Sequence, residues 1–370
     1  MQIIDKLYKG YVPLYPIEKF CPVEKALFVD IETTGLKKET TSLYLIGCGF
    51  YTSDGFMTRL FFADNSSEEE LILNDFASFI KGFSNLFHFN GLKFDIPYLE
   101  YKAGKYNMTG MFDGIVQNDV YRLCAPLRFL LFPDSMRQKA IESFLGIPRD
   151  DLYNGGELIE VYKRYESTPN ESDLSLLVTH NREDVLGMHL IMPILAYLDF
   201  KDADLEFIGY MINSYTDYNG ENLEELLLEY SCNISVVRSF TSKTGSMYLK
   251  YSAETSRLLI RLPIYTCEMK IFFDDWRNYR YLPGEDTVIL KELAATLSKD
   301  RYIKATKETC YQRVSGKFVK QPSDLFKPVL KTAYKDKKKY FRFPDSFNKE
   351  AADEFGRSLI NIFFTMKRRN

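Results

Sequence analysis

The segment Ala26-Leu27-Phe28-Val29-Asp30-Ile31-Glu32-Thr33-Thr34-Gly35-Leu36 determines how the first half of this chain is interpreted. It begins as an apolar strand, carries two acids two residues apart, and then breaks at a glycine. Because side chains alternate along a strand, Asp30 and Glu32 share one face. We therefore expect a pair of carboxylates at the end of a buried strand.

Two later segments add acidic side chains at places where elements begin or turn. His88-Phe89-Asn90-Gly91-Leu92-Lys93-Phe94-Asp95 leads from a short strand into a helix and ends in Asp95. His180-Asn181-Arg182-Glu183-Asp184-Val185 lies inside a long helix with apolar periodicity. His180 and Asp184 are four residues apart, so they lie on one face of that helix.

Four carboxylates brought together need cations, because like charges raise one another's pKa and oppose folding. Hard oxygen ligands suit Mg²⁺ or Mn²⁺, and two such ions about 3.5 to 4 Å apart clamp both reacting oxygens of a phosphodiester. We expect two ions, no small-molecule organic cofactor, and phosphodiester hydrolysis. His180 suits a general base near neutral pH. The expected metal ligands are Asp30, Glu32, Asp95 and Asp184.

Taken together, these motifs resemble a known family. Asp30-x-Glu32 with Thr33-Thr34-Gly35-Leu36, Asn90-Gly91-x-x-Phe94-Asp95, and His180-Asn181-x-x-Asp184-Val185 are similar to the three exonuclease motifs of the DEDD superfamily. Tyr44-Leu45-Ile46-Gly47 adds a resemblance to its YprB-type ribonuclease H-like branch, over roughly residues 15 to 200. The histidine lies four residues before the last aspartate, the interval of the tyrosine-using branch, whereas histidine-using members have five.

The resemblance implies both a fold and a reaction. The fold is α/β, a ribonuclease H-like mixed sheet of five strands flanked by helices. The reaction is 3′ to 5′ exonuclease cleavage of single-stranded DNA or RNA. The backbone at Thr33, Thr34 and Gly35 would approach the terminal nucleotide, Leu36 would wedge against its base, and Asn90 would bond its sugar or phosphate.

Charge is distributed unevenly along the chain. Residues 1 to 200 hold 19 Lys and Arg against 28 Asp and Glu, a net charge of −9, while residues 201 to 370 hold 29 against 23, or +6. Residues 291 to 370 alone hold 20 against 9, or +11. Such a stretch attracts polyanions. Within it, Lys335-Asp336-Lys337-Lys338-Lys339 is either a solvated charge run or a phosphate-contact surface.

The length of 370 residues favours two domains. We expect an extended arm over residues 1–22, an exonuclease domain over 23–200, and an accessory α+β domain over 201–370 that binds nucleic acid. In this last domain we expect a short helix over Asn222–Tyr230, strands over Val236–Tyr281, a helix near Thr287–Leu297 and a final helix from Lys349.

The remaining composition favours a protein of the reducing cytoplasm. The six cysteines are scattered without a C-x-x-C pair, the first residues lack a secretory pattern, and no apolar run approaches 18 residues, so no membrane partner is expected. Two alternatives to a nuclease stay open. One is a catalytically idle nucleic-acid-binding protein that keeps the fold, and the other is a protein-binding adaptor.

Overall fold

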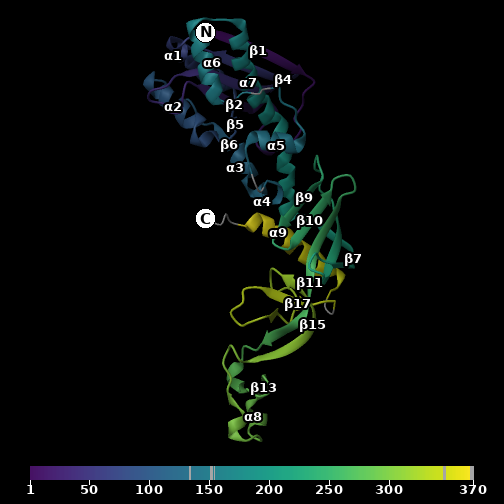
Figure 1. Ribbon diagram of the computed structural model, residues 1–370. Helices are drawn as coiled ribbons and strands as arrows, with labels where there is room; N and C mark the ends of the chain where they lie inside the picture. The colour runs from purple at the N-terminus through teal and green to yellow at the C-terminus, as the bar shows by residue number, and fades with distance from the viewer. Residues whose placement is uncertain (133–134, 151–152, 154, 345–346, 367–370) are drawn as a thin grey trace. The chain divides into compact units, whose positions relative to one another are not determined.

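The computed structural model describes residues 1–132, 135–150, 153, 155–344 and 347–366. The chain divides into two units (Figure 1). The first comprises Met1–Arg128 and Phe132–Leu198, and the second comprises Phe129–Leu131 and Asp199–Asn370. Each unit is built around a sheet of its own.

The sheet of the first unit contains β1 (Gln2–Lys9), β2 (Ala26–Thr33), β3 (Leu43–Thr52), β4 (Gly55–Phe62), β5 (Asn85–His88) and β6 (Val116–Asp119). Its order is β1-β4-β3-β2-β5-β6. Neighbours from β1 to β2 are antiparallel, and β2, β5 and β6 are parallel. The sheet is mixed, as expected, but it has six strands where five were expected. The additional strand is β1, because residues expected to form a separate arm pair along β4.

Strand β2 is covered on both faces. Leu27, Val29 and Ile31 lie in a core with α1 (Glu69–Phe79) and α2 (Asp95–Lys105). The opposite face carries the alternate residues, which include Asp30 and Glu32, and it packs under α7 (Glu171–Ile191). The two acids therefore interrupt a strand that is apolar on both faces up to Ile31.

The first unit contains further helices. They are α3 (Val120–Cys124), α5 (Gln138–Leu145) and α6 (Gly155–Ser167), and α4 (Arg128–Leu131) runs into the second unit. The long helix expected to contain His180 is α7, and it gives way to a 3-10 segment at Met192–Asp202. Among the described residues, no helix has both the length and the apolar character to cross a bilayer.

A buried ion pair fastens the two helices on the Leu27 face. Glu69 of α1 and Lys102 of α2 are 2% and 3% exposed, and Lys102 Nζ lies 2.8 Å from Glu69 Oε1. Glu69 also accepts the backbone N–H of Leu43, and Lys102 donates to the carbonyl oxygen of Thr41. Burial alone would raise the pKa of Glu69, but hydrogen bonds from Lys102, Leu43 and Tyr106 lower it. The network holds the loop between β2 and β3 against α1 and α2.

The second unit is built around the long strand β11 (Arg257–Phe272). This strand belongs to an eight-stranded sheet with β7 (Leu205–Thr216), β8 (Asn222–Cys232), β9 (Phe240–Thr244), β10 (Met247–Ser252), β15 (Tyr311–Gln321), β16 (Leu330–Lys331) and β17 (Lys339–Arg342). Within this sheet, β11 pairs directly with β8, β10, β15 and β16. Helix α9 (Lys349–Thr365) begins where it was expected and packs on β7. A small sheet of β12 (Tyr279–Leu282), β13 (Thr287–Leu290) and β14 (Ile303–Lys304) lies beside α8 (Lys291–Ala294).

Two of the helix predictions for this unit are wrong. Asn222–Tyr230 is strand β8, in which Leu226, Leu228 and Tyr230 are fully buried at a period of two. Pairing with β7 and β11 on both sides outweighs the helix propensity of its Leu and Glu residues. The segment Thr287–Leu297 is β13 followed by the single short turn of α8.

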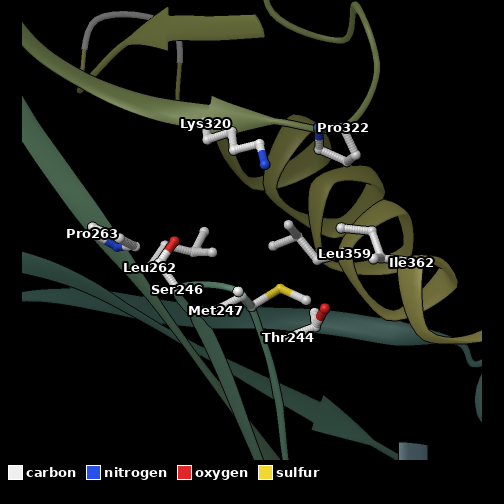
Figure 2. Close-up of a pocket in the computed structure, with 10 residues that line it drawn as sticks. Thr244, Ser246, Met247, Leu262, Pro263, Lys320, Pro322, Leu359 and Ile362 are labelled. Carbon is white, nitrogen blue, oxygen red and sulfur yellow. The ribbon is translucent and has the colours of Figure 1, made fainter. Parts of the chain in front are cut away.

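A cavity of about 340 Å³ opens between α9 and the sheet of this unit (Figure 2). Leu359 and Ile362 of α9 face Met247 and Leu262 across it, and Lys320 directs its amino group toward it. The residues that line it include no acid. This cavity is therefore unsuited to hard cations, and the acidic chemistry lies in the first unit.

The Glu69–Lys102 pair gives a stability prediction. Glu69→Ala should lower the free energy of unfolding by about 3–5 kcal/mol, because it leaves the Lys102 charge buried without its carboxylate. Urea denaturation followed by circular dichroism measures the change. Glu70→Ala removes the neighbouring exposed acid and should change stability by less than about 0.5 kcal/mol. Equal losses in the two variants would contradict this account.

Candidate active site

Asp30 is held by a contact between the sheet and α7. In the register of β2 and β3, Asp30 lies opposite Gly47. Asn181 of α7, which is fully buried, donates from Nδ2 to Asp30 Oδ2 over 2.8 Å. A Cβ atom on Gly47 would lie only 1.8 Å from Asn181 Oδ1. The glycine therefore lets α7 come close enough for Asn181 to position the carboxylate.

Glu32, His180 and Asp184 converge beside this contact. One potential ligand atom from each lies within 4.8 Å of the others. His180 Nε2 is 3.5 Å from Glu32 Oε1 and 3.4 Å from Asp184 Oδ2. Glu32 and His180 are buried, and Asp184 is partly exposed. The interval of four residues thus brings the imidazole and the last carboxylate together on α7, over the end of β2.

The carboxylates interact strongly with one another. Burial raises the pKa of Asp30 well above its usual value, and the charges of Asp184, Asp95 and Glu32 raise it further. The guanidinium of Arg149 acts in the opposite direction. The four acids of the sequence motifs therefore belong to one electrostatic site.

Asp95 approaches this site from the start of α2. Burial raises its pKa to about 6, although hydrogen bonds from the backbone N–H groups of Asp95 and Ile31 oppose the shift. The bond to Ile31 places Asp95 directly beside β2. The charges of Asp119 and Asp184 raise the pKa further. A buried carboxyl that resists ionisation in this way is typical of a functional site.

Arg149 is a member of the site that the motifs do not reveal. Its Nη2 donates to Asp184 Oδ1 over 2.7 Å, and its Nη1 lies 3.2 Å from both oxygens of Glu142. The side chain is 12% exposed. Arg149 therefore neutralises part of the acidic cluster and orients Asp184, whose other oxygen faces His180.

The donor set fits divalent cations. Buried carboxylates with raised pKa values gain stability from bound positive charge, and carboxylate oxygens are the ligands preferred by Mg²⁺ and Mn²⁺. Glu32, Asp184 and the imidazole of His180 offer ligand atoms at close range. Asp30 and Asp95 supply further oxygens in the same electrostatic site.

The loop after β2 is braced by its own threonines. Thr33 Oγ1 donates to the carbonyl oxygen of Gly35 over 2.8 Å, and Thr34 Oγ1 accepts the backbone N–H of Ser42 over 2.8 Å. Leu36 is 84% exposed. An apolar side chain thus projects from a hydrogen-bonded loop into solvent, next to the motif acids in sequence.

Asn90 lies in the loop after β5 with a left-handed backbone, φ 60°. Its backbone N–H donates over 2.9 Å to Oδ1 of Asp119, which also caps α3. Asp119 was not expected from the sequence. Because β5 and β6 are parallel and His88 pairs with Asp119, the ends of these strands meet at one edge of the sheet.

The other two histidines belong to the core, as their sequence context favours. His189 is fully buried, its Nδ1 lies 2.7 Å from Tyr51 Oη, and burial lowers its pKa to about 4. His88 is also fully buried, and its Nδ1 accepts the backbone N–H of Gly91. Of the three histidines, only His180 lies among the motif carboxylates.

A cavity of about 510 Å³ opens onto this cluster. Its volume falls within the range of roughly 300–1,000 Å³ that is usual for ligand pockets. The lining includes Asp30, His180 and Asp184, together with Phe89, Arg137 and Lys139. The candidate active site is therefore open to a substrate.

Comparison with known protein families identifies the fold of the first unit. The RNase_H_2 family model, of the RNase H superfamily, matches residues 27–196. These residues form a ribonuclease H-like domain. The assignment agrees with the mixed sheet and its flanking helices, and the finer YprB-type assignment stays a resemblance.

Solved structures show weaker similarity. The chain is 17% identical to a family B DNA polymerase from the hyperthermophilic archaeon Pyrobaculum calidifontis over 53% of this chain and 29% of that one, with a TM-score of 0.40. Against zinc-bound E. coli exonuclease I with single-stranded DNA, identity is 10% over 93% and 74% of the two chains, with a TM-score of 0.27. These scores are too low to bear on function. No curated protein is significantly similar to the chain.

Gly47 offers a test of how the ribonuclease H-like domain is assembled. Gly47→Ala should force Asn181 away from Asp30, because the new methyl group would overlap Asn181 Oδ1. We expect a loss of about 1–3 kcal/mol of unfolding free energy, the usual cost of overpacking a core. Urea denaturation measures it. Gly82→Ala, at a glycine with open space around it, is the control and should be close to neutral.

Asp95 predicts how stability depends on pH in EDTA. A folded pKa of about 6, raised from 3.8, means that its ionisation opposes folding, so stability falls as pH rises from about 4 through 6. Asp95→Asn should therefore stabilise the metal-free protein at pH 8 by up to about 3 kcal/mol and change it little at pH 4. Urea denaturation at both pH values measures this, with the exposed Asp75→Asn as control. A loss of stability in Asp95→Asn at pH 8 would contradict the raised pKa of Asp95.

Proposed function

We propose that the ribonuclease H-like domain is a DEDD-type, metal-dependent 3′ to 5′ exonuclease that hydrolyses single-stranded DNA or RNA. The observation that supports this most is the convergence of Glu32, His180 and Asp184 within 4.8 Å, with Asp30 and Asp95 coupled to them electrostatically. The family match supports a nucleic-acid substrate. The direction of cleavage rests on the motif resemblance.

Asp30, Glu32, Asp95 and Asp184 would hold two Mg²⁺ or Mn²⁺ ions. When bound, such ions stabilise the negative charge that develops on the attacking and leaving oxygens of the phosphodiester. Asn181 keeps the Asp30 carboxylate in place, and Arg149 does the same for Asp184. The protein thus contributes preorganised ligands, which cost no rearrangement at the moment of reaction.

His180 would act as the general base. Its imidazole Nε2 lies 3.5 Å from Glu32 Oε1 and 3.4 Å from Asp184 Oδ2, and it would accept the proton of the attacking water. The imidazole also lines the open cavity, where water and substrate have access to it.

The loops after β2 and β5 would hold the terminal nucleotide. The backbone braced by Thr33, Thr34 and Gly35 would approach the nucleotide, and the exposed Leu36 would pack against its base. Asn90, fixed through its backbone to Asp119, would direct its side-chain amide to sugar or phosphate. These roles follow the resemblance of the motifs.

The second unit would be an accessory nucleic-acid-binding domain. In its basic stretch, Lys337 and Lys338 are exposed, whereas Lys335 and Lys339 pair with Glu308 and Asp324 at 2.8 and 2.6 Å. Lys367, Arg368 and Arg369 belong to the same stretch and lie outside the described residues. A binding protein without catalysis is less well supported, because binding alone does not require the costly gathering of buried carboxylates.

The proposal predicts distinct effects at two positions. With Mn²⁺ or Mg²⁺, the protein should shorten a 5′-labelled oligonucleotide stepwise, and EDTA should stop it. Asp30→Asn should abolish both the activity and the rise in melting temperature caused by Mn²⁺, since a ligand at 100 times its Kd stabilises by about 2.7 kcal/mol. His180→Ala should lower kcat by about 10²–10⁴-fold and keep most of the thermal shift.

DNA and RNA oligonucleotides of the same sequence, each labelled at the 5′ end, would identify the substrate class and the direction. Immediate release of a labelled mononucleotide, in place of a ladder, would indicate digestion in the 5′ to 3′ direction. Absence of any cleavage, together with an unchanged melting curve in millimolar Mn²⁺, would overturn the proposed function. Loss of the thermal shift in His180→Ala would make His180 a ligand in place of a base.

A further inference from the structure

The cavity over the carboxylates has cationic residues on its lining as well as acidic ones. Asp30 and Asp184 line it together with Arg137 and Lys139, at the start of α5. We propose that Arg137 and Lys139 bind backbone phosphates of the nucleic-acid strand that enters this cavity, and so act as substrate-positioning residues. This inference rests on the proposed nuclease function and identifies residues that the three motifs do not contain.

The position of these cations is fixed through the residue between them. Gln138 Nε2 donates over 2.9 Å to the backbone carbonyl oxygen of Asp184, and over 2.9 Å to Oε1 of Glu142. The first bond ties the start of α5 to the helix that carries His180 and Asp184. Because Gln138 is anchored there, Arg137 and Lys139 on either side of it remain beside the carboxylate cluster.

Arg137 is not needed to neutralise the carboxylates of the site. Asp184 is neutralised by Arg149 at 2.7 Å, and Asp30 is held by the neutral amide of Asn181. The Arg137 side chain is exposed, and among the described residues no carboxylate forms an ion pair with it. A guanidinium in this position matches a phosphate, which it can bind through two parallel hydrogen bonds.

Lys139 adds a second cation on the same lining. Its side chain is exposed, and its Nζ donates to the carbonyl oxygen of Tyr153 over 3.3 Å. A phosphodiester near four carboxylates is repelled until positive charge offsets them. Both cations belong to the same unit as the carboxylates, so their effect does not depend on the second unit.

The test uses two double variants. The cavity variant carries Arg137→Gln and Lys139→Gln, and the matched control carries Lys9→Gln and Lys81→Gln. The control removes two exposed lysines of the same unit that do not line the cavity. Binding of a fluorescent oligothymidylate is followed by anisotropy in Ca²⁺ at several salt concentrations. Steady-state cleavage is measured in Mn²⁺, and melting temperatures with and without Mn²⁺ report folding and metal binding.

For the cavity variant we expect about tenfold weaker binding, and a log–log salt slope smaller in magnitude by about 1.4, since single strands contribute about 0.7 per phosphate contact. KM should rise while kcat changes little, and the Mn²⁺-induced thermal shift should stay at the wild-type value. The control variant should keep the wild-type slope and KM.

A cavity variant with the wild-type slope and KM would overturn the inference while leaving the nuclease function intact, provided that the wild-type protein cleaves the oligonucleotide. A wild-type protein that neither binds nor cleaves it would overturn both. An equal loss of affinity in the control variant would mean diffuse attraction by the whole unit, and would also overturn the assignment of phosphate contacts to Arg137 and Lys139.

Discussion

Mutual repulsion between buried carboxylates is the constraint on which the first unit depends. Burial and the charges of neighbouring carboxylates raise the pKa of both Asp30 and Asp95. The fold offsets this cost with an internal guanidinium, with amide and backbone donors, and with a helix held tightly against the sheet. Groups that oppose the stability of a fold are typical of functional sites, so the cluster is consistent with a compromise between folding and the proposed cation binding.

The motif residues could be predicted from the sequence because their geometry is local. Alternation on β2 and the helical interval on α7 fix which side chains share a face, and these two periods require no knowledge of the tertiary structure. The mixed sheet also follows from the order of strands and helices along the chain. Nothing in the spacing, however, shows that β2 and α7 approach each other so closely.

The partners of the motifs were harder to predict, since they depend on contacts between distant segments. Arg149 comes from a connection without a periodic pattern, and Asp119 reaches the site because β6 lies parallel to β5. Strand β1 was not recognised because an edge strand needs only one partner, and its pairing with β4 is invisible in the local sequence. In the second unit, the Leu- and Glu-rich strand β8 shows the opposite problem, because its local propensity points to a helix and its neighbours impose a strand.

Gly47 has a consequence for how sequences of this kind are compared. The glycine lies on a different strand from the first aspartate, yet the antiparallel register ties the two positions together as firmly as adjacency in the chain would. A sequence profile built only from acids and histidine would accept a protein with alanine at this position, although its helix could not seat the asparagine against the aspartate. Including this glycine and Asn181 as a coupled pair would make such a profile more selective, and would guide any attempt to graft the carboxylate cluster onto another sheet.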